Sequence, residues 1–190
     1  MKKTILICSI LLTTAFLYGQ EIKISVAPTI NNALYFKFVA GGPGRNFKPG
    51  FSTSLDYSFI RDKKINLGFG LAYHFSQVEY TPNMNTGDLI RQTDKLKLIS
   101  VSFATIYNLN RLYLSLNPML DFQLNKNADQ ITDKQMGLGI SFSIGKHFEI
   151  SDNLKLNLEP KLWIHNIIPF NSEFGSLKLT TAGLNVGLVF

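Results

Sequence analysis

Eight ionisable side chains stand out because each occupies the polar position of a segment in which apolar and polar residues alternate. They are Lys23, Asp56, His74, Asp121, Lys155, Glu159, Lys161 and His165. Both charge signs are present, so a shared interior would let these groups form ion pairs and hydrogen bonds. We expect a polar network that fills the interior of the fold. The alternative is that the same residues line a narrow ion path or a ligand site.

His74 and Ser76 form a second candidate site, with Glu79 close by in the sequence. A serine hydroxyl becomes a nucleophile when an adjacent base takes its proton. Both residues, however, occupy the polar positions of an alternating segment, so their side chains are predicted to point into the interior. There, a hydrogen-bonded histidine is the simpler expectation.

Composition excludes several other kinds of chemistry. The single cysteine rules out a disulfide scaffold and a cysteine-based zinc site. The three histidines, His74, His147 and His165, lack metal-ligand spacing, so we expect no metal and no cofactor. The formal net charge is +6, but no basic cluster indicates nucleic-acid binding. Charged residues make up only 17% of the chain, which favours a β-rich protein facing an apolar medium.

The N-terminus has the layout of a secretory signal peptide. Basic residues at Lys2 and Lys3 precede an apolar run from Thr4 to Phe16, and the small Gly19 follows. The run is too short to span a bilayer comfortably as a helix. We therefore predict a signal peptide over residues 1–19 and a single exported domain over residues 20–190. Cys8 would be removed with the signal peptide.

Alternation with a period of two predicts eight strands after residue 20. They cover Ile22–Ile30, Phe51–Ile60, Ile65–Phe75, Leu98–Tyr107, Leu112–Leu124, Met136–Ile144, Leu154–His165 and Ala182–Phe190. One parity carries large apolar side chains, and the other carries glycine, serine, asparagine and charged residues. These strands are longer than usual soluble strands and match tilted membrane-spanning strands.

The connections alternate between long and short, which indicates an up-and-down meander with both termini at the short-turn end. Asn31–Gly50 and Ser76–Lys97 are predicted as long outer loops, and Arg61–Lys64 and Asn108–Asn110 as short turns. This layout predicts an all-β, eight-stranded antiparallel transmembrane barrel in the outer membrane. Aromatic residues near both strand ends favour the same fold. Its narrow interior has room for side chains but not for a water channel.

Some features do not follow the pattern. Pro28, Pro118 and Pro160 lie inside predicted strands, where proline removes a donor from the ladder, so bulges could absorb them. The alternation slips near Leu98–Ile99 and near Thr180–Thr181, which again suggests bulges or rims. The segment 34–38 is assigned to the first outer loop, because a ninth strand would break the parity.

The signal peptide, the eight alternating segments and the terminal run Leu184, Val186, Leu188 and Phe190 resemble a known family. The mature chain is similar to the PorT-like, outer membrane protein β-barrel domain family of Bacteroidota, with an architecture like OmpX and the OmpA barrel. The resemblance implies that the barrel assembly machinery reads Phe190. It also implies a surface, envelope or secretion-assembly role without enzyme activity.

Two further expectations depend on a barrel in the outer membrane. Four basic residues, Lys37, Arg45, Lys48 and Arg91, could contact lipopolysaccharide phosphates at the outer surface. His74 and Ser76 resemble the catalytic pair of outer-membrane lipid A deacylases, but Gln77 stands where that family has asparagine. Lipid cleavage would also need both side chains to face lipid.

The main alternative is a soluble, periplasmic, lipocalin-like barrel that binds a lipid. It would use the same alternation with the large apolar residues turned inward. A lipid A-modifying enzyme is the third possibility. We expect a non-enzymatic outer-membrane barrel that acts as a monomer.

Overall fold

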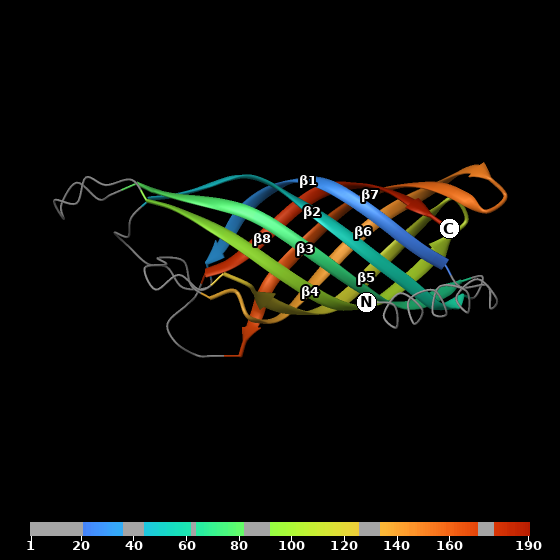
Figure 1. Cartoon of the computed structure of the whole chain (residues 1–190). Coiled ribbons are helices and arrows are strands. Elements are labelled where there is room, and N and C mark those ends of the chain that lie inside the picture. Colours follow the sequence, from blue (N-terminus) through green and yellow to red (C-terminus); the bar gives the residue numbers. More distant parts are fainter. Residues whose placement is uncertain (1–20, 36–43, 62–63, 82–91, 126–133, 171–176) are drawn as a thin grey trace, which may run out of the picture.

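Eight antiparallel strands close into one barrel (Figure 1). The computed structural model describes residues 21–35, 44–61, 64–81, 92–125, 134–170 and 177–190. The strands are β1 Glu21–Tyr35, β2 Gly44–Arg61, β3 Ile65–Thr81, β4 Gln92–Leu109, β5 Leu112–Gln123, β6 Gly137–Ser151, β7 Leu154–Pro169 and β8 Leu177–Val189. Each strand pairs with its sequence neighbours, and β8 pairs with β1. The predicted all-β, eight-stranded up-and-down barrel is confirmed.

Through most of the barrel, large apolar side chains lie outside, and smaller or polar side chains turn inward. In β5 the alternation is strict, with every second residue buried. Exposed apolar residues on the outer wall include Ile24, Leu55, Leu71, Val101, Leu116, Phe142 and Leu184. Buried polar residues on the inner wall include Ser25, Ser54, Ser100, Asn117, Ser141, Asn157 and Asn185. This sense of alternation is opposite to the one that the lipocalin-like alternative requires.

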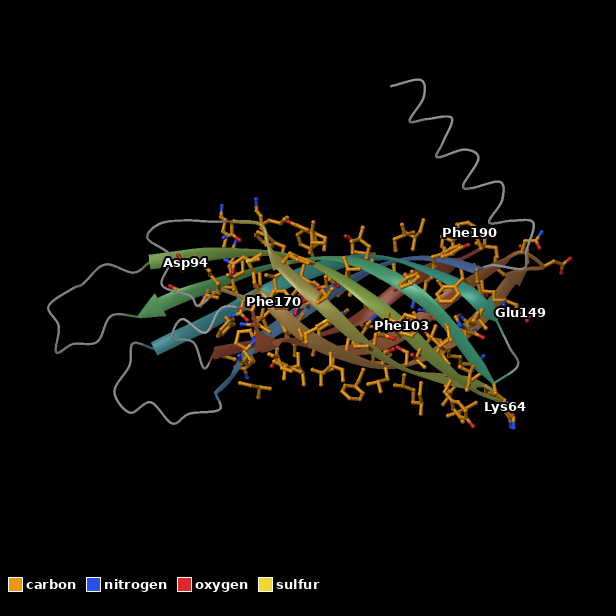
Figure 2. All side chains as sticks on the ribbon, turned by 90° about the horizontal axis from the view of Figure 1, so that it is seen from below. Lys64, Asp94, Phe103, Glu149, Phe170 and Phe190 are labelled. Atoms are coloured by element: carbon orange, nitrogen blue, oxygen red, sulfur yellow. The ribbon has the colours of Figure 1, made fainter. Side chains whose placement is uncertain are left out.

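The first and last strands meet at a backbone seam. The Ile22 N–H donates to the Phe190 carbonyl oxygen at 3.1 Å, and the Phe190 N–H donates to the Ile22 carbonyl oxygen at 2.9 Å. From there the seam runs to Tyr35 and Leu177 at the opposite end. Phe190, Lys64 and Glu149 lie at the same end of the barrel, as the meander predicts (Figure 2).

The strands extend further at the opposite, outer end than predicted. Residues 31–35, 44–50, 76–81 and 92–97 were assigned to loops and are strand. Leu34 and Tyr35 continue β1 instead of belonging to a loop. At this end Asp94 lies further out than Phe170, because β2, β3 and β4 project beyond the rest of the barrel (Figure 2). Lys37 and Arg91 lie outside the described residues, as does the predicted signal peptide.

The three prolines do not produce bulges. Pro28, Pro118 and Pro160 all lie on the outer face. On one side of each, the ladder skips two residue pairs and resumes in the same register. Because the missing N–H affects only one neighbouring strand, no extra residue is needed.

Register shifts occur elsewhere, between Lys48 and Phe51, Ser58 and Ile60, Leu138 and Ile140, and Glu149 and Ser151. Neither Leu98–Ile99 nor Thr180–Thr181 is a bulge, so the bulge half of that expectation was wrong. The slip near Leu98 instead marks the start of the outer end, where Leu98 joins a buried apolar cluster. Within the part of the chain that the structure describes, no helix has the length and apolar character to cross a membrane.

Candidate functional site in the lumen

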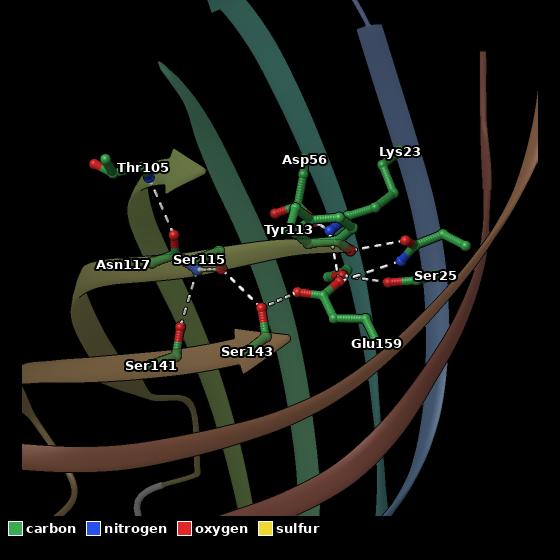
Figure 3. A network of polar contacts seen from close by, with 12 residues as sticks. Lys23, Ser25, Asp56, Thr105, Tyr113, Ser115, Asn117, Ser141, Ser143 and Glu159 are labelled. Atoms are coloured by element: carbon green, nitrogen blue, oxygen red, sulfur yellow. Dashed lines mark hydrogen bonds and ion pairs between the residues drawn. The ribbon is translucent and has the colours of Figure 1, made fainter. Parts of the chain in front are cut away.

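An ion-pair cluster occupies the lumen toward the short-turn end (Figure 3). The Lys23 Nζ of β1 lies 3.1 Å from the Asp56 Oδ2 of β2 and 2.7 Å from the Glu159 Oε2 of β7. The barrel closes where β8 pairs with β1, and β7 lies on the other side of β8, so Glu159 comes near a lysine far away in the sequence. Ser143 donates to the other Glu159 oxygen. One buried cation is therefore shared by two buried carboxylates.

Small hydroxyl and amide side chains continue this network across the lumen. The Asn117 Nδ2 donates to the Ser115 Oγ at 3.0 Å and to the Ser141 Oγ at 3.2 Å. The Ser115 and Ser143 hydroxyls are 2.8 Å apart, which connects this group to Glu159. These contacts give the buried hydroxyl and amide groups of this layer hydrogen-bond partners, which burial demands.

Tyr113 closes the cluster toward the short-turn mouth. Its hydroxyl donates to the Asn157 Oδ1 at 2.7 Å, and its ring stacks on His147 with the centroids 4.8 Å apart. Beyond it, the Lys155 Nζ lies 3.3 Å from the Glu21 Oε1, where both side chains are partly exposed. Lys155 therefore belongs to the rim of the mouth rather than to the Lys23 cluster.

A second polar centre forms around Asp121 in the outer half of the lumen. The Asp121 carboxylate accepts hydrogen bonds from the Ser100 hydroxyl and, at 3.1 Å, from the Asn166 backbone N–H. The His165 Nδ1 lies 3.1 Å from the same carboxylate. Asn166 has a φ of 52°, and the register of β7 against β6 shifts at this point. This irregularity turns two consecutive residues inward, so both reach Asp121.

His74 and Ser76 are buried in the lumen and do not form a nucleophile–base pair. Within the described residues, neither His74 nitrogen nor the Ser76 hydroxyl has a hydrogen-bond partner. The His74 ring instead meets His165 and Trp163 edge-on, with centroid distances of 4.8 and 5.2 Å. The Lys161 Nζ lies 5.5 Å from the Trp163 ring centroid. The side chains face the lumen, where a membrane lipid could not reach them.

An apolar cluster closes the lumen at the outer end. Its members Val78, Leu96, Leu98 and Leu179 are at most 1% exposed, and Phe47 packs against them. Gln135 lies beside the cluster and is fully buried. Its side-chain oxygen accepts from the Leu179 N–H at 3.1 Å, and its own N–H donates to the Gln123 Oε1 at 2.8 Å.

The structure therefore brings together only some of the predicted site residues. Lys23, Asp56 and Glu159 form one centre, and Asp121, His165 and His74 lie around another. Sequence reasoning turned the serine and asparagine side chains inward but did not assign Tyr113, Asn157 or this layer to the network. It also missed the apolar cluster, whose signal was the slip in alternation near Leu98.

Other candidate ligand sites have less support. Among the described residues, no group of three or more histidine, cysteine, aspartate or glutamate side chains could hold a metal ion. Of the four predicted lipopolysaccharide contacts, only the Lys48 side chain is described, and its Nζ lies 2.7 Å from the Glu79 carboxylate. Arg45 belongs to β2, but its side chain lies outside the described part of the chain.

Comparisons with known proteins support the fold. No protein-family model and no curated protein matches the chain. The solved structure of the outer membrane protein OprG from Pseudomonas aeruginosa is 13% identical with a TM-score of 0.54, and the match covers 90% of this chain and 96% of that one. The outer membrane protein AlkL in lipid bilayers is 12% identical, with a TM-score of 0.49 and coverage of 90% of each chain.

Ail of Yersinia pestis, in complex with the heparin analogue sucrose octasulfate, is 15% identical with a TM-score of 0.45. That match covers 90% of this chain and 99% of Ail. The OprG match, the one of these three with a TM-score above 0.5, supports the barrel fold of this chain. Membership of the PorT-like family stays a prediction.

Proposed function

We propose that this protein is a non-enzymatic, integral outer-membrane barrel with a filled lumen, which serves at the cell surface or in envelope or secretion assembly. The observation that carries the proposal is the belt of exposed, large apolar side chains around the barrel. Ile24, Leu71 and Phe142 are each 47–54% exposed on this wall. An apolar belt on a closed barrel fits hydrocarbon, where every backbone group needs a partner within the protein.

The lumen is proposed to block the passage of solutes. Asp121, Glu159 and Asn157 are fully buried at different levels, and the apolar cluster closes the outer end. Besides a cavity of about 640 Å³ at the short-turn mouth, next to His147 and Lys155, a cavity of about 20 Å³ lies beside Lys23, Asp56 and Tyr113. The smaller cavity holds roughly one water molecule. The protein would therefore act through its surfaces rather than as a pore.

Outer-membrane lipid and the barrel assembly machinery are the partners in this proposal. Phe190 ends the last strand, and its side chain points outward with 43% of its surface exposed. An exposed terminal aromatic residue is available for recognition before the barrel closes. A further envelope or secretion protein could bind the projecting outer ends of β2, β3 and β4.

Cell fractionation combined with a heat-modifiability gel tests the location and the closed fold. The protein should sediment with the outer membrane, and unboiled samples should migrate differently from boiled ones. A protein that is free in the periplasm and shows no shift would contradict the proposal.

Conductance in a planar bilayer tests the filled lumen separately. The purified barrel should insert without a steady current. A stable open channel would show that solutes pass, and the role would then be transport.

A further inference from the structure

We propose that the outward face of β4 near its outer end binds the phosphorylated headgroup of an outer-leaflet lipid, with Lys95 and Lys97 as the phosphate ligands. This inference rests on the proposed function, because it needs the barrel to sit in a membrane. The two lysines stand two residues apart on one strand, and both side chains are exposed on the outer face.

The position of the lysines along β4 matches the edge of the apolar belt. Val101 and Phe103 follow on the same outward face and are 41% and 38% exposed. Lys97 pairs with Phe75 of β3 on one side, and its carbonyl oxygen accepts from the Leu124 N–H at 2.8 Å on the other. An ammonium group on a flexible stem can lie over such apolar neighbours and reach the headgroup level.

The backbone that carries both lysines is fixed by one side chain. Asn125 accepts a hydrogen bond from the Lys97 N–H at 3.0 Å and donates to the Lys95 carbonyl oxygen. The Asn125 side chain therefore supplies the hydrogen bonds to the β4 backbone that a strand residue would make if β5 continued past Gln123. The two lysines are held at adjacent positions on one face, about 7 Å apart along the strand.

The charge around these lysines leaves them available for an anion. Across the neighbouring strands, Lys95 of β4 pairs with Gln77 of β3, and Gln77 pairs in turn with Lys48 of β2. Lys48 is neutralised by Glu79 at 2.7 Å. No ion pair joins Lys95 or Lys97 to a carboxylate among the described residues. The amide of Gln77 can donate a further hydrogen bond to a phosphate oxygen.

A membrane lipid fits this surface better than a soluble anion. The lysines face outward from the barrel, not into a pocket. Beside Lys97 on the neighbouring strands, Phe75 and Phe51 stack with their ring centroids 5.5 Å apart. Acyl chains can lie on this aromatic and aliphatic wall while the phosphate contacts the ammonium groups, so both parts of one amphipathic molecule are satisfied.

Native mass spectrometry of the purified full barrel with added bisphosphorylated lipid A tests the proposal. In K95Q/K97Q, the affinity for lipid A should fall by about tenfold or more, because two basic contacts near a membrane surface contribute about fivefold each. K95R/K97R should retain binding. The matched control is K64Q/K146Q, which removes two exposed lysines at the short-turn end. This control should bind as the unchanged protein does.

Three outcomes would overturn the lipid site. These are unchanged binding in K95Q/K97Q, an equal loss in K64Q/K146Q, and equal binding of dephosphorylated lipid A. Displacement by millimolar inorganic phosphate would also overturn it, since the site would then take a free anion. Each sample is first checked for heat-modifiability. Absence of the shift in the unchanged protein counts against the membrane barrel itself, so the two failures are distinguishable.

Discussion

The barrel wall and the projecting outer end of the same strands differ in which face is polar. The wall is apolar outside and polar inside, and the outer end is the reverse. On β4, Val101 faces outward and Ser100 inward, whereas four to eight residues earlier Leu96 faces inward and Thr93 outward. The backbone continues without a register shift between these levels. In the proposed membrane location, the two parts differ in the medium on the outside, which is hydrocarbon for the wall and water for the outer end. The outer end is therefore organised like a soluble protein, and the wall is the reverse.

The largest expected effect follows from the charge balance in the polar lumen. Replacement Lys23→Met leaves the carboxylates of Asp56 and Glu159 buried without their cation. Breaking a buried ion pair in this way costs about 3–5 kcal/mol. Urea unfolding of the barrel in lipid vesicles measures the loss. Lys155→Met at the partly exposed mouth is the control and should cost less than about 1 kcal/mol. Equal losses for the two variants would show that burial of the Lys23 cluster does not make its ion pairs more important than the pair at the mouth.

The difference between the two outer faces can be tested with one substitution at two places on β4. Val101→Lys puts a cation on the apolar belt and should destabilise the protein by about 2–4 kcal/mol. Thr93→Lys puts the same group opposite Glu79, above the belt, and should change the stability by less than about 0.5 kcal/mol. The measurement is the free energy of unfolding of each variant in lipid vesicles, compared with that of the unchanged protein. Similar costs at both positions would contradict the boundary between them.

The apolar interior of the outer end predicts a cavity effect. Leu96→Ala removes a fully buried side chain from the cluster with Val78, Leu98 and Leu179, and should cost about 2–3 kcal/mol. Thr93→Ala, on the opposite face of the same strand, should cost no more than about 0.5 kcal/mol. If Leu96→Ala proved neutral by the same unfolding assay, the outer cluster would not be a packed core.

The smallest effect concerns one hydroxyl group in the polar lumen. Tyr113→Phe removes the hydrogen bond to the Asn157 Oδ1, and should cost about 1 kcal/mol. Tyr107→Phe on the outer wall serves as the control, because its ring is 45% exposed. The two variants should differ in their urea midpoints, and identical midpoints would show that the Tyr113 contact contributes nothing.

The comparison also explains what the sequence could predict. Local parity is enough to turn Lys23, Asp56 and Glu159 inward, because alternation is a property of neighbouring residues. Parity does not predict that Lys23 meets Glu159, since that contact depends on how the strands close around the barrel.

The outer ends were misassigned as loops for a related physical reason. A rule that places large apolar residues outward describes the wall and fails where Leu96 and Val78 point inward. The irregularity at Asn166 was missed because no residue pattern distinguishes a positive φ in asparagine from an ordinary turn. It is this local backbone geometry that brings Asn166 to Asp121.

The seam between Ile22 and Phe190 has a kinetic consequence. Each of the other seven strand pairs joins consecutive segments and can form as a hairpin, whereas the seam joins the first strand, β1, to the last strand, β8. Pairing over such a sequence distance is slow, because the loop entropy must be lost before the contacts form. Until the final strand has docked, β1 keeps an open edge. The lifetime of the intermediate in which β1 is unpaired is therefore set by the arrival of β8.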